Sequence, residues 1–173
     1  YVVDCEEGAY LYYGFNREVS KEEFAERIKN NTLLEVLNPV KVKKGDVLFI
    51  ESGTIHAIGK NILIAEIQQN SNVTYRVYDY GRIGKDGKPR ELHVEKALEV
   101  TRREPVRPRE DCAPHVAACD YFVVDKLSAK NEKLTGFVGE ESFKSILVME
   151  GEGEIVNGDE KMSFKKGDSL FLP

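Results

Sequence analysis

Short runs of apolar and β-branched residues, ended by glycine, asparagine or proline, fill most of the chain. Such runs predict strands, and many short strands in succession favour a sandwich or barrel over a parallel sheet with helices. A hairpin is predicted at residues 6–8, between the first two runs, and another at residues 157–159, Asn-Gly-Asp. The predicted strands are residues 1–5, 9–15, 40–43, 47–50, 55–58, 62–69, 73–80, 121–125, 143–149, 153–156, 161–164 and 169–172.

Two capping-box patterns predict a helical insert at about residues 20–37. Ser20 precedes Glu23 by three positions, and flanking apolar residues complete a hydrophobic staple, so a helix is expected to begin at about residue 21. Thr32 and Glu35 repeat the spacing and predict a second short helix, which the following Asn-Pro pair ends. An amphipathic pattern at residues 92–102 predicts one more helix.

One segment occurs twice. Residues 43–50, Lys-Lys-Gly-Asp-Val-Leu-Phe-Ile, are echoed by residues 165–172, Lys-Lys-Gly-Asp-Ser-Leu-Phe-Leu. Internal similarity of this kind indicates two related β modules, so we expect a mainly β fold, a double β-barrel of jelly-roll type truncated at both ends. The predicted domains are a first barrel at residues 1–102, a proline-rich linker at 103–119 and an incomplete second barrel at 120–173.

Composition narrows the function classes. The net charge is −5 and the pI is near 5.4, which gives no basic surface for nucleic acid or an anionic membrane. No apolar run approaches the roughly 18 residues of a membrane span. The three cysteines have no CxxC spacing and no signal peptide precedes them, which favours the cytoplasm. Strand-like runs at both ends of the sequence suggest a fragment of a longer chain.

His56 is the candidate metal ligand. Glycine turns at residues 45–46 and 52–53 flank a short apolar run and place this histidine at the start of the next predicted strand, near a barrel mouth. The alternative is a partly buried histidine with a purely structural role. His93 and His115 are expected to be structural, at a helix start and in the linker.

Polar residues within the next two predicted strands are candidates for a binding pocket. In strand alternation Glu66 and Gln68 share one face of residues 62–69, and Arg76 lies in the middle of residues 73–80. Charged side chains are costly to bury without partners. Either these residues face solvent, or Glu66 and Arg76 line a polar pocket for an anionic ligand.

The spacing from Gly45 through Glu51 and Gly53 to His56 resembles the second sequence motif of the cupin superfamily, in which the histidine is a metal ligand. Glu51 stands where that family usually has proline, and Lys60 where it often has asparagine. The resemblance implies that the double barrel is cupin-like. The first cupin motif, which supplies the other ligands, has no counterpart in this sequence.

A more specific resemblance covers nearly the whole chain. The run from Ser52 to Arg76, with Pro89-Arg-Glu-Leu-His93 after it, is similar to type I mannose-6-phosphate isomerases of the short bacterial form. That resemblance implies a zinc enzyme, one ion per full-length chain, that interconverts mannose 6-phosphate and fructose 6-phosphate. The alternative is a non-catalytic cupin module that binds sugar phosphates or has a regulatory role.

The resemblance also implies roles for four residues. His56 becomes a zinc ligand and Arg76 the active-site arginine. Glu66 falls where the family has a pocket carboxylate, a candidate proton shuttle, and Gln68 is a candidate substrate-binding residue on the same face. The remaining zinc ligands, a histidine of a His-Pro motif and a glutamate expected just before Tyr1, lie outside the sequence, so we expect the fragment alone to be inactive.

Overall fold

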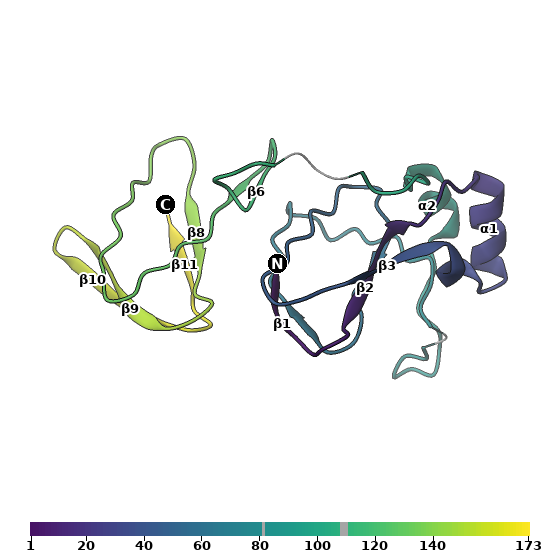
Figure 1. The fold of residues 1–173 in the computed structure, drawn as a ribbon, viewed down its shortest axis with the longest axis horizontal. Helices are drawn as coiled ribbons and strands as arrows, with labels where there is room; N and C mark the ends of the chain where they lie inside the picture. Colours follow the sequence, from purple (N-terminus) through teal and green to yellow (C-terminus); the bar gives the residue numbers. More distant parts are fainter. Residues whose placement is uncertain (81, 108–110) are drawn as a thin grey trace. The chain divides into compact units, whose positions relative to one another are not determined.

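The computed structural model describes residues 1–80, 82–107 and 111–173, and the chain divides into two compact units, Tyr1–Lys126 and Leu127–Pro173. Most elements of both units are strands and the helices belong to the first (Figure 1), so the prediction of a mainly β fold with a small helical part is confirmed. The helices are α1 (Lys21–Lys29), the 3-10 helix η1 (Leu33–Val36) and α2 (Val94–Val100), and the strands are β1 (Val2–Cys5), β2 (Tyr10–Phe15), β3 (Leu37–Lys41), β4 (His56–Ala57), β5 (Ile62–Ile64), β6 (Ala117–Ala118), β7 (Val123–Val124), β8 (Lys144–Leu147), β9 (Glu152–Asn157), β10 (Glu160–Lys165) and β11 (Ser169–Leu172).

The described residues of the first unit form three small antiparallel sheets, in the orders β1-β5, β3-β2-β4 and β6-β7. The predicted hairpin between β1 and β2 is wrong. The turn itself forms, with Gly8 at φ 79° and the Ala9 N–H donating to the Glu6 carbonyl at 3.1 Å. The two strands then separate, because β1 pairs with β5 while both edges of β2 pair with β3 and β4. A local turn signal does not choose the strand partners.

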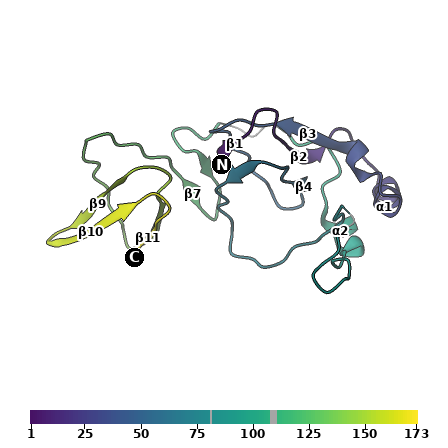
Figure 2. The ribbon, with the colours of Figure 1, turned by 90° about the horizontal axis from the view of Figure 1, so that it is seen from below.

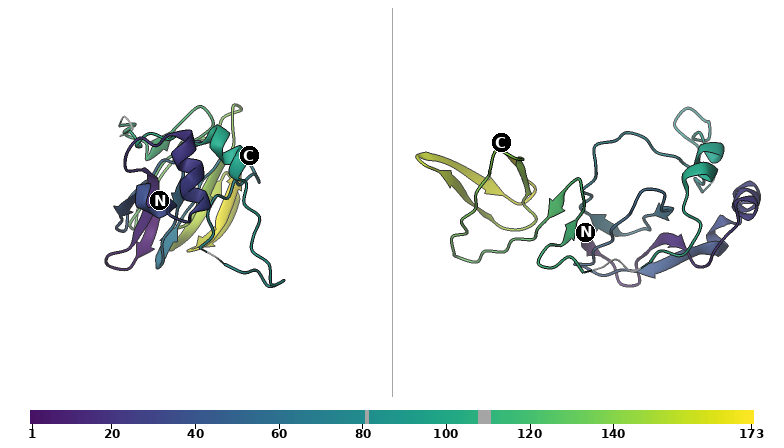
Figure 3. Two further views of the ribbon diagram at one scale, coloured as in Figure 1. Left: turned by 90° about the vertical axis from the view of Figure 1, so that its right-hand side faces the viewer. Right: turned by 90° about the horizontal axis from the view of Figure 1, so that it is seen from above.

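The core of the first unit has two clusters. In the larger one Phe24 of α1 is fully buried and meets Phe15 edge to face, with ring centroids 5.5 Å apart. α2 lies beside α1 (Figures 1 and 3) and packs Val94 and Leu98 against the same cluster. The smaller cluster is formed by Val2, Ala9, Leu11 and Val42.

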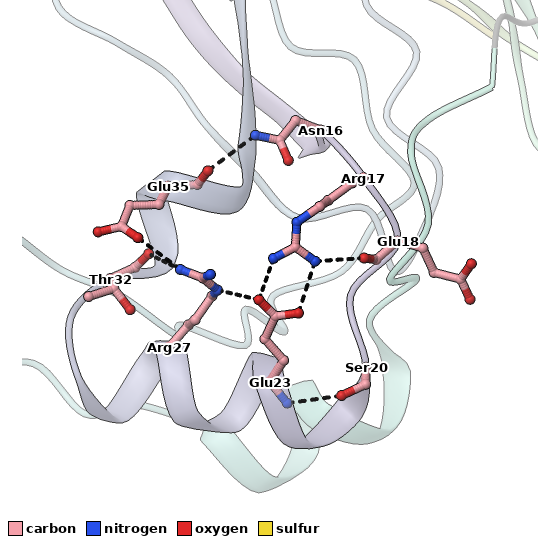
Figure 4. A network of polar contacts seen from close by, with 8 residues as sticks. All are labelled: Asn16, Arg17, Glu18, Ser20, Glu23, Arg27, Thr32 and Glu35. Carbon is pink, nitrogen blue, oxygen red and sulfur yellow. Dashed lines mark hydrogen bonds and ion pairs between the residues drawn. The ribbon is translucent and has the colours of Figure 1, made fainter.

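The start of α1 is confirmed. The Ser20 hydroxyl accepts a hydrogen bond from the Glu23 N–H at 3.1 Å, as the capping box predicts. The Glu23 carboxylate pairs with Arg17 and, at 2.7 Å, with Arg27, which also reaches Glu35 at 3.0 Å (Figure 4). The hydrogen bonds from Arg17 and then Arg27 lower the pKa of Glu23 to about 2.

This lowered pKa predicts an acid-dependent loss of stability. The folded state holds the Glu23 carboxylate ionised down to about pH 2, while the unfolded state takes up the proton near the ordinary value of 4.5. The stabilisation is therefore complete above pH 4.5 and is lost as the pH falls toward 2. We expect Glu23→Gln to remove this part of the pH dependence in denaturant unfolding at a series of pH values. Glu26→Gln, an exposed residue of the same helix, is the control, and an unchanged pH profile for Glu23→Gln would contradict the prediction.

The second predicted helix forms as a 3-10 helix and not as an α-helix. Residues Leu33–Val36 form one 3-10 turn, and Thr32, at φ −107° and ψ 13°, makes no side-chain cap. Asn38 and Pro39 lie inside β3 and do not end a helix. Burial explains the short turn, because Leu33 and Val36 enter the larger cluster within a single turn.

Several predicted strands are shorter than expected or absent. Residues 47–50 and 73–80 form no strand, and only Ile62–Ile64 of residues 62–69 do so. Residues 55–58 and 121–125 are reduced to β4 and β7. A strand needs a second backbone alongside it to accept and donate its hydrogen bonds. The sequence pattern does not show whether such a neighbour is present.

The second unit pairs β8 with β11 and β9 with β10. The predicted turn at residues 157–159 is confirmed, since Asn157 lies opposite Glu160 across the two-residue loop of the β9–β10 hairpin (Figure 2). Gly158 has φ 61°, a left-handed conformation that favours glycine.

The sequence repeat is also a structural repeat. In the first copy the Asp46 carboxylate accepts from the Lys43 N–H at 2.9 Å, and in the second Asp168 accepts from the Lys165 N–H at 2.8 Å. The glycines between them, Gly45 and Gly167, have φ 94° and 93°. The shared residues therefore form the same turn in both units.

The predicted linker is described in part, because residues 108–110 lie outside the described residues. Its start packs on the first unit: the Arg103 carbonyl accepts from the Val19 N–H at 2.9 Å, and Pro105 bridges to Phe15. The predicted domain boundaries stay a prediction.

Among the helices of the described residues, none is long and apolar enough to cross a membrane.

Candidate functional site

The loop before His56 is built by one glycine turn and one ion pair. The Thr54 N–H donates to the Glu51 carbonyl at 3.0 Å, and Gly53 inside this turn has φ 85°. A Cβ on Gly53 would lie 2.6 Å from the Val100 carbonyl oxygen, so only glycine fits against the end of α2. Arg102 holds the same loop from that end, since its N–H donates to the Gly53 carbonyl at 2.9 Å and its guanidinium pairs with Glu51.

His56 opens β4 opposite Tyr13 of β2. Its Nδ1 lies 3.0 Å from the Thr54 carbonyl oxygen, which can only accept, so Nδ1 carries a proton, and in the neutral ring Nε2 has the free lone pair. The ring is exposed. A histidine whose one nitrogen donates to a backbone carbonyl while the other is accessible has the usual arrangement of a metal ligand.

Arg76 is held by His93, seventeen residues further along the chain. The His93 N–H donates to the Arg76 carbonyl at 2.7 Å, and the Arg76 N–H donates to His93 Nδ1 at 3.2 Å. Because a backbone N–H can only donate, His93 Nδ1 is unprotonated and its neutral ring carries hydrogen on Nε2. The tautomer is therefore opposite to that of His56.

The Arg76 guanidinium donates to the Glu91 carbonyl at 3.4 Å and, among the described residues, has no carboxylate partner. Nearby, Asp79 is paired with Arg90, whose Nε lies 2.8 Å from its carboxylate. Arg90 lowers the pKa of Asp79, with smaller contributions from Arg76 and Arg82. Only Arg90 contacts the Asp79 carboxylate, while Arg76 and Arg82 act on it through their charge, and three cations near one carboxylate suit an anionic ligand.

Glu66 and Gln68 follow the end of β5 and are exposed. The Glu66 carboxylate acts on the α-amino group of Tyr1, where it opposes the burial that lowers the pKa of that amino group. Glu66 therefore lies toward the side of the sheet where β1 begins.

The described contacts do not bring the four predicted site residues together. No hydrogen bond or ion pair between described residues joins His56, Glu66, Gln68 and Arg76 to one another. Within the same residues, no group of three or more histidine, cysteine or carboxylate side chains could hold a metal ion. His56 thus has the form of one ligand, without a complete set around it.

Sequence reasoning missed two supporting residues. His93 lies at a helix start as predicted, since it is the N-cap residue of α2, but the sequence did not show that its ring holds the backbone of Arg76. Its place in the Pro89–His93 run was the available signal. Glu51, a departure from the cupin pattern, pairs with Arg102. His115, as expected, takes a local role and bonds Asp125 at 2.7 Å.

Comparisons with known proteins give one family. The family model described as mannose-6-phosphate isomerase, cupin domain, matches residues 113–173. The chain is 40% identical to mannose-6-phosphate isomerase ManA of Bacillus subtilis and 34% identical to mannose-6-phosphate isomerase of Streptococcus mutans, in each case over its whole length. The crystal structure of the mannose 6-phosphate isomerase from Bacillus subtilis matches the whole chain with a TM-score of 0.70 at 32% identity. The chain spans 57%, 56% and 57% of the length of these proteins. The match confirms the cupin fold.

Proposed function

Since this chain belongs with the type I mannose-6-phosphate isomerases, we propose that the protein to which it belongs interconverts mannose 6-phosphate and fructose 6-phosphate. The observation that carries the proposal is the similarity along the whole chain, in sequence and in fold.

The reaction sets the chemistry that the site must provide. In the open-chain sugar phosphate a proton leaves C2, the carbonyl moves from C1 to C2 through an enediol, and a proton is added at C1. A base must accept and return that proton, and a cation must stabilise the negative charge that develops on oxygen. The phosphate, at the far end of the substrate, favours a site of net positive charge.

The side chains of this chain fit these tasks. Arg76, permanently charged and held through its backbone by His93, stabilises the enediolate oxygens or orients the substrate. Glu66 takes the proton from C2 and returns it to C1, and Gln68 on the same face hydrogen-bonds sugar hydroxyls. Arg90 is already paired with Asp79 and is less available to substrate.

Zinc is part of the proposal for the whole protein, with His56 as one ligand through Nε2. When bound, the ion supplies Lewis-acid polarisation of the sugar oxygens. Zinc takes three or four protein ligands, and the described residues offer one at this place, so the steps above are assigned to side chains alone.

We also place the protein in the cytoplasm. All three cysteines, Cys5, Cys112 and Cys119, are free thiols, as is usual in a reducing compartment.

Turnover separates this proposal from a non-catalytic binding module. We expect the longer natural chain to form fructose 6-phosphate from mannose 6-phosphate and to contain zinc by elemental analysis, while residues 1–173 alone give no product. Saturable binding of mannose 6-phosphate by the longer chain without product would favour the binding module. Product formation by residues 1–173 would show that this part of the chain holds a complete site.

A further inference from the structure

The helix α2 contacts the surroundings of two candidate-site residues, Arg76 and His56. No hydrogen bond or ion pair between described residues joins these two directly. The N-cap residue of α2, His93, holds Arg76, and the residue after its C-cap holds the loop that leads to His56. α2 is therefore an element through which the two parts of the site are connected.

At the N-terminal end of α2, three groups of Arg76 contact residues 91–93. The Arg76 N–H donates to His93 Nδ1 at 3.2 Å, and the Arg76 carbonyl accepts from the His93 N–H at 2.7 Å. The guanidinium donates to the Glu91 carbonyl at 3.4 Å. The His93 ring also packs on Tyr75, with ring centroids 6.1 Å apart. Because two of these contacts use the backbone of Arg76, they set the point from which its side chain extends.

Helical hydrogen bonds and packing make α2 a firm support between its two ends. The Ala97 N–H donates to the His93 carbonyl at 3.0 Å, and the Thr101 N–H donates to the Ala97 carbonyl at 2.9 Å. Ala97 is buried, and Val94 and Leu98 pack on the larger cluster. With a rise of about 1.5 Å per residue, the run from His93 to Thr101 is about 12 Å long.

At the C-terminal end of α2, Arg102 makes two contacts with the loop before His56. Its N–H donates to the Gly53 carbonyl at 2.9 Å, and its guanidinium pairs with Glu51. Both partners belong to the turn that ends at Thr54, whose carbonyl oxygen lies 3.0 Å from His56 Nδ1. The end of the helix therefore acts on the orientation of the His56 ring through a single turn.

We propose that α2 is a spacer that sets the separation and relative orientation of Arg76 and His56, with His93 and Arg102 as positioning residues at its two ends. The catalytic consequence rests on the proposed isomerase function. A substrate that contacts both candidate-site residues needs them in one geometry, because displacements of about 1 Å can cost roughly 10²-fold in rate. The two positioning residues act through Arg76 and the His56 loop.

A substitution between the two ends tests whether the helix connects them. Glu99 is exposed on α2 and has no ion pair among the described residues. Glu99→Gly and Glu99→Ala both remove the carboxylate, but only glycine weakens the helix. In the longer natural chain, Glu99→Gly should speed amide hydrogen exchange, followed by NMR, about fivefold at both Arg76 and Arg102, whereas Glu99→Ala should match the parent. The Val42 amide, which donates to the Ala9 carbonyl in the smaller cluster, is the internal control and should not change.

Two substitutions of His93 separate its acceptor role from its packing. His93→Asn keeps an oxygen that can accept from the Arg76 N–H, whereas His93→Phe keeps a ring beside Tyr75 and has no acceptor. In the longer natural chain we expect kcat to fall at least about tenfold for His93→Phe and less than about threefold for His93→Asn, with KM changed less than kcat. A purely structural role of the ring would give the opposite order, because phenylalanine preserves more of the packing.

The outcomes distinguish the spacer from the proposed function. Unchanged exchange at Arg76 and Arg102 in Glu99→Gly, or a change at only one of them, would overturn the spacer. An equal change at Val42 would also overturn it, since it would show a general loss of stability. A kcat for His93→Phe equal to or above that for His93→Asn would remove the positioning role of His93. If the parent forms no fructose 6-phosphate, the proposed function fails, while the exchange comparison still decides whether α2 connects the two residues.

Discussion

Replacing Arg76 with alanine in the longer natural chain is expected to lower kcat for mannose 6-phosphate isomerisation by about 10²-fold or more. The guanidinium has no ion pair with a carboxylate among the described residues, so its charge is available to the enediolate of the proposed reaction. Its backbone is fixed in both directions by His93, which limits the reorganisation needed during reaction. Steady-state kinetics with detection of fructose 6-phosphate measures the effect, and kcat and KM separate a loss of transition-state stabilisation from a loss of binding.

Two further variants make that result specific. Arg76→Lys keeps the charge and loses the planar fork of donors, so its kcat should lie between those of Arg76→Ala and the parent. Arg107→Ala removes an exposed arginine that has no described ion pair and should change kcat less than about threefold. If Arg76→Ala stays as active as Arg107→Ala, Arg76 has no part in the reaction.

Features that depend on neighbouring residues were predictable from the sequence. The Ser20 cap of α1 and the two-residue turn of the β9–β10 hairpin form as expected because each needs only residues within a few positions. The sequence repeat also predicted a structural repeat correctly, since Asp46 and Asp168 close the same local turn. The turn before His56 in the candidate site was predictable for the same reason, because it depends on residues close together in the sequence.

Features that depend on distant partners were not predictable. β1 was expected to pair with its sequence neighbour and instead pairs with β5, more than fifty residues away. Residues 47–50 have a strand pattern, but the pattern cannot say whether a second backbone lies alongside. The contact of His93 with Arg76 is of the same kind, because helix and strand periodicity place each residue on its own element and do not show which elements meet.

Replacing Phe24 with alanine is expected to destabilise the first unit by about 3–5 kcal/mol. The side chain is fully buried, packs edge to face on Phe15 and joins α1 to the larger cluster, which also receives Val94 and Leu98 of α2. Its removal leaves a cavity beside β2, which is paired with β3 and β4 on its two edges, so collapse into the cavity is limited. Denaturant unfolding followed by NMR, with signals from each unit observed separately, measures the change in the free energy of unfolding.

The matched control is Phe137→Ala in the second unit. Phe137 is 80% exposed, so its truncation removes little buried surface and should change the free energy of unfolding by less than about 0.5 kcal/mol. Because the two units are separate compact bodies, Phe24→Ala should lower the midpoint for signals of the first unit and leave those of Leu127–Pro173 close to the parent. An equal shift of both sets of signals would mean that the units unfold as one cooperative body, and a loss below about 1 kcal/mol would mean that α1 contributes little to the core that supports the site.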